Sequence, residues 1–115
     1  MNERKTYAGA VMVICAYKPK AGKDAMLLEI MKTHVPILRS QGLATDRPAS
    51  IMKAGDGTVV EVFEWVSQKA IEEAHKNPEV LKMWKTFEEA CTYIPVSDLD
   101  ESKHMFSDFE PIDFK

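Results

Sequence analysis

The sequence predicts an α+β fold in which a four-stranded antiparallel sheet carries helices on one face. The clearest sign is a hairpin, because two strand-like runs, Ala49 to Ala54 and Thr58 to Val66, flank the turn Gly55-Asp56-Gly57. An Asp-Gly step suits this turn because it accepts the positive φ angles that tight hairpins need. A helical pattern precedes the hairpin, two more follow it, and a strand-like run lies towards each end of the chain.

The first strand and the first helix differ in the spacing of their apolar residues. Tyr7 to Tyr17 is a nearly continuous apolar run rich in β-formers, which predicts a central strand covered on both faces. After a Lys-Pro-Lys-Ala-Gly break, a helix is expected from about Lys23 to Gln41, ending at Gly42 and kinked near Pro36. The apolar side of this helix carries Leu27, Ile30, Met31, His34 and Ile37 or Leu38.

Two helices and a strand are expected after the hairpin. Ser67 is a suitable N-cap for a helix of residues 68–76, and Asn77-Pro78 ends that helix and begins the next one. The second helix is expected to end at Pro95, and His104 to Ile112 is expected to be the last strand. The apolar side of the second helix carries Val80, Met83, Trp84, Phe87, Cys91 and Ile94.

This element order, βαββααβ, is that of a ferredoxin-like layout. The helices of one domain can cover only one face of its sheet, yet the strand Thr58 to Val66 is mostly apolar on both faces. A second copy of the sheet is the economical cover for the other face, so we expect a homodimer. The two alternating sets are Val60, Val62, Glu64 and Val66, and Val59, Glu61, Phe63 and Trp65.

Composition narrows the class of protein. A chain of 115 residues can bury one core and form one domain. Its net charge of −3 gives no reason to bind nucleic acid, and no apolar run approaches the roughly 20 residues that span a membrane. Cys15 and Cys91 lie far apart in apolar runs, which predicts buried free thiols and a cytoplasmic protein. No metal is expected, since the sequence has no CxxC pair and no zinc-ligand spacing.

A strand that ends in Trp65, followed by Ser67, Ala70 and His75 in the next helix, resembles the antibiotic biosynthesis monooxygenase family. The similarity in element order covers nearly the whole chain, and the similarity in motif covers residues 59–84. The resemblance implies one domain over residues 1–115 with the dimeric α+β barrel fold of that superfamily. It also implies an oxidoreductase, because the family includes quinol and aromatic-polyketide monooxygenases that use no metal or flavin, and haem-degrading enzymes.

The chain departs from the family pattern at two positions. Phe63 stands where an acid is common, and Val80 stands near the position of a second histidine. Because that histidine would be an iron ligand, its absence argues against haem degradation. We therefore expect no cofactor.

His34, Glu61 and His75 are the candidate catalytic residues. His34, on the apolar side of the first helix, could be a general base, because histidine titrates nearest neutral pH; it could also be a core histidine bonded to a carbonyl. His75 lies near a helix C-terminus and could simply cap it. Glu61 shares a strand face with Trp65, so it faces the helices if Trp65 does, as the resemblance implies. It could orient a histidine, bind substrate, or form a buried ion pair with Lys or Arg.

Four apolar side chains are candidates for binding a flat aromatic ligand, and otherwise belong to the core. Glu64, on the opposite strand face, is expected to form a salt bridge between subunits. Two histidines and a carboxylate could also bind a metal ion, but these ligands come from separate elements and no local spacing supports the site. The four binding candidates are Trp65, Trp84, Phe63 and Met31.

Two functions are compatible with these residues. The first is a cofactor-independent monooxygenase, or a related enzyme, in which His34 or His75 takes a proton from an aromatic or quinol-type molecule and the anion reacts with oxygen. The second is a non-catalytic small-molecule-binding or stress-related dimer that uses the same pocket or none. The sequence predicts that His34, Glu61 and His75 face one pocket between sheet and helices, walled by Trp65 and Trp84.

Overall fold

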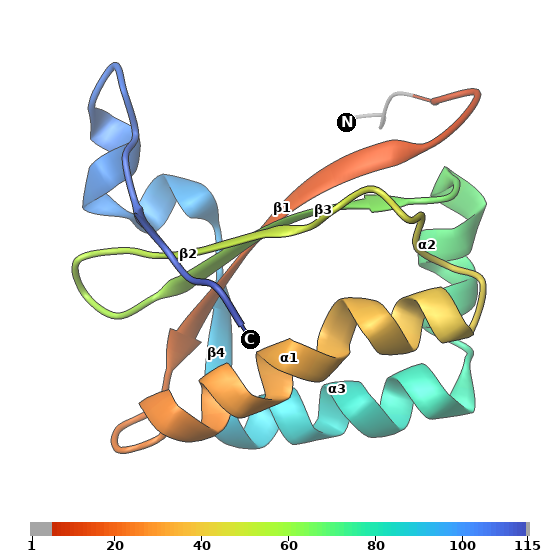
Figure 1. The fold of residues 1–115 in the computed structure, drawn as a ribbon, viewed down its shortest axis with the longest axis horizontal. Helices are drawn as coiled ribbons and strands as arrows, with labels where there is room; N and C mark the ends of the chain where they lie inside the picture. The colour runs from red at the N-terminus through yellow and green to blue at the C-terminus, as the bar shows by residue number, and fades with distance from the viewer. Residues whose placement is uncertain (1–5, 115) are drawn as a thin grey trace, which may run out of the picture.

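Five strands and three α-helices make up the fold of the computed structural model, which describes residues 6–114 (Figure 1). In chain order they are β1 (Val11–Pro19), α1 (Asp24–Ser40), β2 (Ser50–Lys53), β3 (Val59–Trp65), α2 (Gln68–Ala74), α3 (Pro78–Ala90), β4 (Cys91–Ile94) and β5 (Glu110–Pro111). The sheet is antiparallel, with the strand order β4-β1-β3-β2-β5. In Figure 1, α1 and α3 pack together below the sheet. This α+β arrangement is compatible with a ferredoxin-like fold.

The pairing of β1 with β3 decides which side chains face the helices. Cys15 lies opposite Glu61 in this pairing, and directly opposite residues share one face of a sheet. Tyr17 is two residues further along β1 and therefore lies on the same face. The larger core cluster joins Tyr17 to Leu27 of α1 and Phe87 of α3, so this face is the helix side.

The local signals for the hairpin and for the starts of the two helices after it are confirmed. Gly57 adopts a φ of 93° in the turn between β2 and β3, a conformation that suits glycine. The Ser67 side chain accepts a hydrogen bond of 3.0 Å from the backbone N–H of Ala70, as an N-cap does. Pro78 is the first residue of α3, after the N-cap Asn77. None of the helices in the described part of the chain is long and apolar enough to cross a membrane.

The predicted strand at His104 to Ile112 is wrong over most of its length, and so is the strand number of four. Only Glu110–Pro111 forms a strand there, and it pairs with β2 at the sheet edge. The edge beside β1 is taken by Cys91–Ile94, which the helical spacing of Cys91 and Ile94 had placed in the preceding helix. The β-prone run Thr-Tyr-Ile gains ladder hydrogen bonds to β1 that a longer helix would leave unmade.

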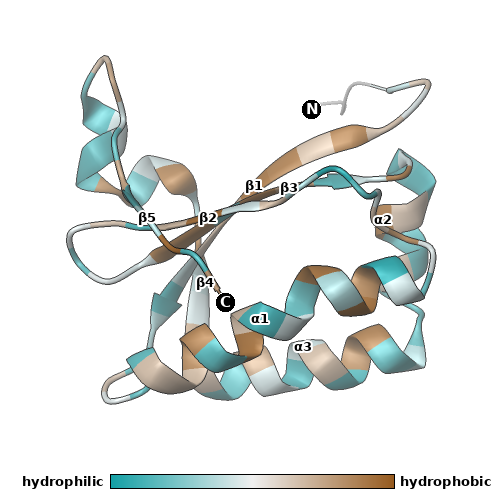
Figure 2. Ribbon diagram, in the orientation of Figure 1, coloured by the Kyte–Doolittle hydropathy of each residue, from teal (hydrophilic) through white to brown (hydrophobic). Residues whose placement is uncertain are grey.

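The sheet face opposite the helices is covered only in part by the chain itself. Two short 3₁₀ turns, Val96–Asp98 and Asp100–Lys103, follow β4 and place Leu99 in a small core cluster with Val60. Further along the same face of β1, Ile14 keeps 58% of its surface exposed and Met12 keeps 50%. Figure 2 shows much of β1 in the brown of hydrophobic residues. The chain therefore covers one half of this face and leaves apolar side chains open on the other.

Candidate functional site

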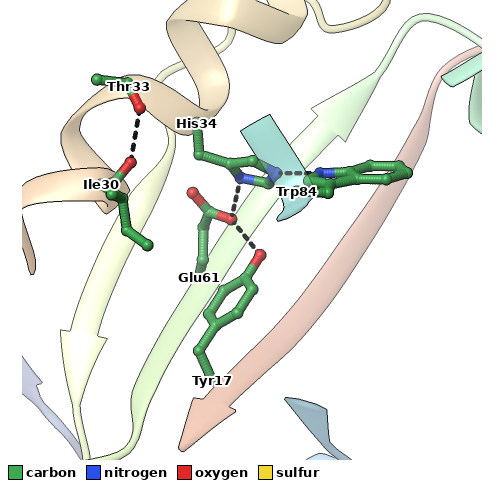
Figure 3. A network of polar contacts seen from close by, with 6 residues as sticks. All are labelled: Tyr17, Ile30, Thr33, His34, Glu61 and Trp84. Carbon is green, nitrogen blue, oxygen red and sulfur yellow. Dashed lines mark hydrogen bonds and ion pairs between the residues drawn. The ribbon is translucent and has the colours of Figure 1, made fainter. Parts of the chain in front are cut away.

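Glu61 lies at the centre of a buried polar network on the helix side of the sheet (Figure 3). It comes from β3, and its side chain is fully buried. Its Oε1 atom accepts a hydrogen bond of 2.8 Å from the Tyr17 hydroxyl of β1. The same oxygen lies 2.8 Å from Nδ1 of His34, a residue of α1. The register of β1 against β3 and the helical phase of α1 thus bring three distant segments together.

His34 is held at both of its ring nitrogens. The indole Nε1 of Trp84, on α3, donates a hydrogen bond of 3.2 Å to Nε2 of His34 (Figure 3). An indole N–H can only donate, so Nε2 presents its lone pair there, and a neutral imidazole then carries its hydrogen on Nδ1. That hydrogen is donated to Glu61. These hydrogen-bond directions therefore select the Nδ1–H tautomer of His34.

Among residues 6–114, no Lys or Arg side chain forms an ion pair with the Glu61 carboxylate. Its Oε1 atom is hydrogen-bonded to Tyr17 and His34, and its Oε2 atom has no hydrogen-bond partner among these residues. This overturns the expected alternative of a buried ion pair with Lys or Arg. Burial, and next the negative charge of Glu61, raise the pKa of Tyr17 far above its ordinary value, so Tyr17 remains a neutral donor. Burying a charge that has only neutral partners costs free energy, so such a charge usually has a function.

Aromatic rings enclose the imidazole of His34 on several sides. Its ring centroid lies 5.5 Å from that of Phe63 and 5.1 Å from that of Phe87, both edge to face. The ring of Tyr17 lies 6.2 Å away, also edge to face. These contacts lock the ring orientation and exclude water from the Glu61 side of the imidazole.

A pocket of about 400 Å³ opens beside this network, and we refer to it as the aromatic pocket. His34 and Trp84 line it, whereas Glu61 lies behind His34 and does not reach its wall. Nε2 is therefore the nitrogen of His34 nearer the pocket. The wall is predominantly apolar, and its other residues are Cys15, Ala16, Tyr17, Phe63, Trp65, His75, Glu88, Tyr93 and Ile94.

The predicted site residues are brought together in part. His34 and Glu61 are in contact, and Trp65, Trp84 and Phe63 line the pocket beside them. Met31 does not line the aromatic pocket; it is buried in the main core, about one turn of α1 away from His34.

His75 shares the pocket but not the polar network. It is the C-cap of α2 and is exposed, and its Nδ1 lies 2.7 Å from the carbonyl of Ile71. Its ring packs edge to face on Trp84 with the centroids 5.0 Å apart. His75 therefore combines the capping role with a place in the pocket wall. Its link to His34 runs through Trp84.

Glu64 does not need a second subunit for its ion pair. Its carboxylate lies 3.2 Å from Nε of Arg47, and it accepts a hydrogen bond of 2.8 Å from the Thr45 hydroxyl. These two contacts, the Thr45 bond first, lower the pKa of Glu64. The chain itself thus supplies an ion pair for Glu64, and the salt bridge between subunits stays a prediction.

Tyr17 and Tyr93 are site residues that sequence reasoning missed. The apolar run that contains Tyr17 was interpreted as buried on both faces, so no face was assigned to its hydroxyl. Tyr93 was placed in a helix, whereas β4 sets it opposite Tyr17 with the ring centroids 5.7 Å apart. A strand alternation from Val13 through Cys15 to Tyr17 was the available signal.

The part of the chain that the structure describes holds no group of three or more His, Cys, Asp or Glu placed to bind a metal ion. The two-histidine, one-carboxylate arrangement does not form, because Trp84 and Glu61 already occupy both nitrogens of His34. Compared with known family models, curated proteins and solved structures, the chain gives no match.

Proposed function

We propose that the aromatic pocket binds an aromatic or quinol-type small molecule and that His34 acts on it as a general base. The observation that carries this proposal is the buried Glu61–His34 pair directly behind an apolar pocket. A carboxylate bonded to Nδ1–H orients the imidazole and stabilises the imidazolium that forms when Nε2 takes a proton. The activity proposed is cofactor-independent monooxygenation, as the resemblance to the antibiotic biosynthesis monooxygenase family implies.

The reaction begins with a proton transfer from the substrate hydroxyl to Nε2 of His34. The resulting quinol anion is electron-rich and reacts with dioxygen, which is the oxidant. A quinol with a free ring C–H and one dioxygen give a hydroxyquinone and one water, so one oxygen atom is inserted and the other is reduced. The proton held by His34 leaves with that water. The apolar wall, with Phe63 and Trp65, limits the access of solvent to the anion.

A second candidate is non-catalytic binding of the same class of molecule. It is favoured by one observation: the Trp84 indole already occupies the lone pair of Nε2 that a base needs. A pocket whose histidine is already hydrogen-bonded at both ring nitrogens can bind an apolar ring without reacting with it.

Oxygen uptake with 1,4-dihydroxynaphthalene separates the two candidates. We expect uptake above the protein-free background, and a drop of at least about 100-fold in His34→Gln, the low end of what a general base contributes. His104→Gln is the matched control, because His104 is exposed and outside the pocket. Uptake that is equal in both variants would contradict base catalysis by His34. Binding without uptake would select the second candidate.

We also propose that the chain forms a dimeric α+β barrel, in which a second copy covers the open half of the sheet. Met12 and Ile14 are exposed there, and Met105 and Phe106 keep 90% and 80% of their surface exposed. The segment after the 3₁₀ turns, which carries Met105 and Phe106, lies on the side of the sheet away from α1 and α3 (Figure 1). A two-fold axis can place this apolar segment of each copy near the open strand face of the other, as a self-complementary interface requires.

A further inference from the structure

We infer that the Trp84 indole blocks Nε2 of His34, and that only a neutral ligand with its own O–H or N–H donor displaces it. We refer to this blocking hydrogen bond as the latch. This inference rests on the proposed binding role of the aromatic pocket but not on any turnover there. It assigns Trp84 as a specificity-determining residue, and it narrows the proposed ligand class from aromatic molecules in general to those that carry an O–H or N–H donor.

The first step is the occupancy of Nε2. With Glu61 on Nδ1 and Trp84 on Nε2, no lone pair of His34 is open to the pocket. A ligand can reach Nε2 only if the indole N–H leaves it. Because the vacated nitrogen is an acceptor, the ligand must supply a donor in place of the indole, or a buried acceptor is left unsatisfied.

The second step is that Trp84 is the member of the network that can move. Tyr17, His34 and Glu61 are buried, whereas Trp84 is half-buried and packs on the exposed His75 at the pocket wall. Among the described residues, its indole donates one hydrogen bond, to His34, and an indole turned outward can donate to water instead.

The third step is the charge of the ligand. Glu61 holds a buried carboxylate immediately behind the imidazole, and within the described part of the chain no Lys or Arg lines the aromatic pocket. An anion seated against Nε2 would meet both a lone pair and that negative charge. The pocket therefore selects the protonated form of a phenol or quinol, which is also the form that can give a proton to a base.

Calorimetry with Trp84→Phe tests the latch, because phenylalanine keeps an aromatic ring and removes the competing N–H. The probes are 1-naphthol, which has a donor, and 1-methoxynaphthalene, which has none. We expect Trp84→Phe to bind 1-naphthol about fivefold more tightly than the wild type does, which is the factor that one hydrogen bond is worth. We expect no such gain in the affinity for 1-methoxynaphthalene. An equal change for both probes, or weaker binding of 1-naphthol alone, would overturn the inference.

A ligand-free measurement keeps the inference testable if neither probe binds. In ¹⁵N spectra of the wild type, His34 should be a neutral imidazole with its hydrogen on Nδ1, and His34→Gln should shift the indole N–H signal of Trp84. His104→Gln should leave that signal in place. A Trp84 signal that is unchanged in His34→Gln would show that no latch exists. If the Trp84–His34 hydrogen bond is present but no oxygen uptake is seen, only the proposed base catalysis is contradicted, and the inference about Trp84 stands.

Discussion

Replacement of Glu61 by glutamine removes a buried charge while keeping the shape of the side chain. In the wild type, Oε1 accepts from Tyr17 and from His34, each at 2.8 Å. A glutamine carbonyl oxygen has two lone pairs and can accept both bonds. The amide NH₂ group then takes the place of Oε2, which has no partner among the described residues.

The free energy of unfolding changes through opposing contributions. Two charge-assisted hydrogen bonds become neutral ones, which costs about 2 kcal/mol in total. The unsatisfied amide adds about 1–3 kcal/mol, as a buried donor without a partner does. Against this, the desolvation penalty of a buried ion, several kcal/mol, is removed. We therefore expect Glu61→Gln to unfold within about 1 kcal/mol of the wild type, since these contributions nearly cancel.

Glu61→Ala is the contrasting variant. It leaves the hydroxyl of Tyr17 and the Nδ1–H of His34 without an acceptor and opens a cavity. These costs outweigh the same relief of desolvation, so we expect a loss of about 3–5 kcal/mol. The assay is urea unfolding at one fixed protein concentration, because the stability of an oligomer depends on concentration. A loss in Glu61→Gln as large as in Glu61→Ala would refute the reasoning, because it would mean that the carboxylate charge is compensated in the fold.

Three further predictions concern Tyr17, Cys15 and Ile14. Tyr17→Phe removes one hydrogen bond to a carboxylate and should lower the free energy of unfolding by about 1.5–3 kcal/mol in the same urea assay; no loss would contradict the 2.8 Å bond. Burial, and next the charge of Glu61, raise the pKa of Cys15 to about 11, so its alkylation by iodoacetamide should be slow at pH 8 and rise about tenfold for each pH unit up to pH 10. A rate already at its plateau at pH 8 would contradict this. Ile14→Glu should shift light scattering towards the monomer, whereas Leu81→Glu, at an exposed position on α3, should not; an unchanged mass in Ile14→Glu would count against the proposed dimer face.

The elements that the sequence predicted correctly are those determined by local chemistry. The hairpin turn before β3 depends on Gly57, and the start of α2 depends on the Ser67 side chain. The strand alternation of β3 placed Glu61, Phe63 and Trp65 on one face, and the structure has them together on the helix side. Each of these signals acts over a few residues, so a single sequence contains it.

The elements that were missed depend on contacts between distant segments. Cys91 and Ile94 are compatible with a helical face, and only pairing with the free edge of β1 makes this segment a strand. The hydroxyl of Tyr17 bonds to Glu61 because β1 and β3 pair in one particular register. The spacing of residues within either strand does not predict that register. His75 was expected to face one pocket with His34 and Glu61. It does line the pocket with His34, but its position after the last turn of α2 leaves it exposed beside Trp84 and outside the polar network.

A crystal structure of the protein with bound 1-naphthol tests the central claim most directly, which is that Nε2 of His34 is the polar contact of the aromatic pocket. We predict the naphthol oxygen within about 2.6–3.2 Å of Nε2, with the ring against Phe63 and Trp65 and the Trp84 indole turned away. Glu61 should still accept from Nδ1 of His34. A naphthol bound elsewhere, or bound in the pocket with the Trp84–His34 hydrogen bond intact, would contradict the claim.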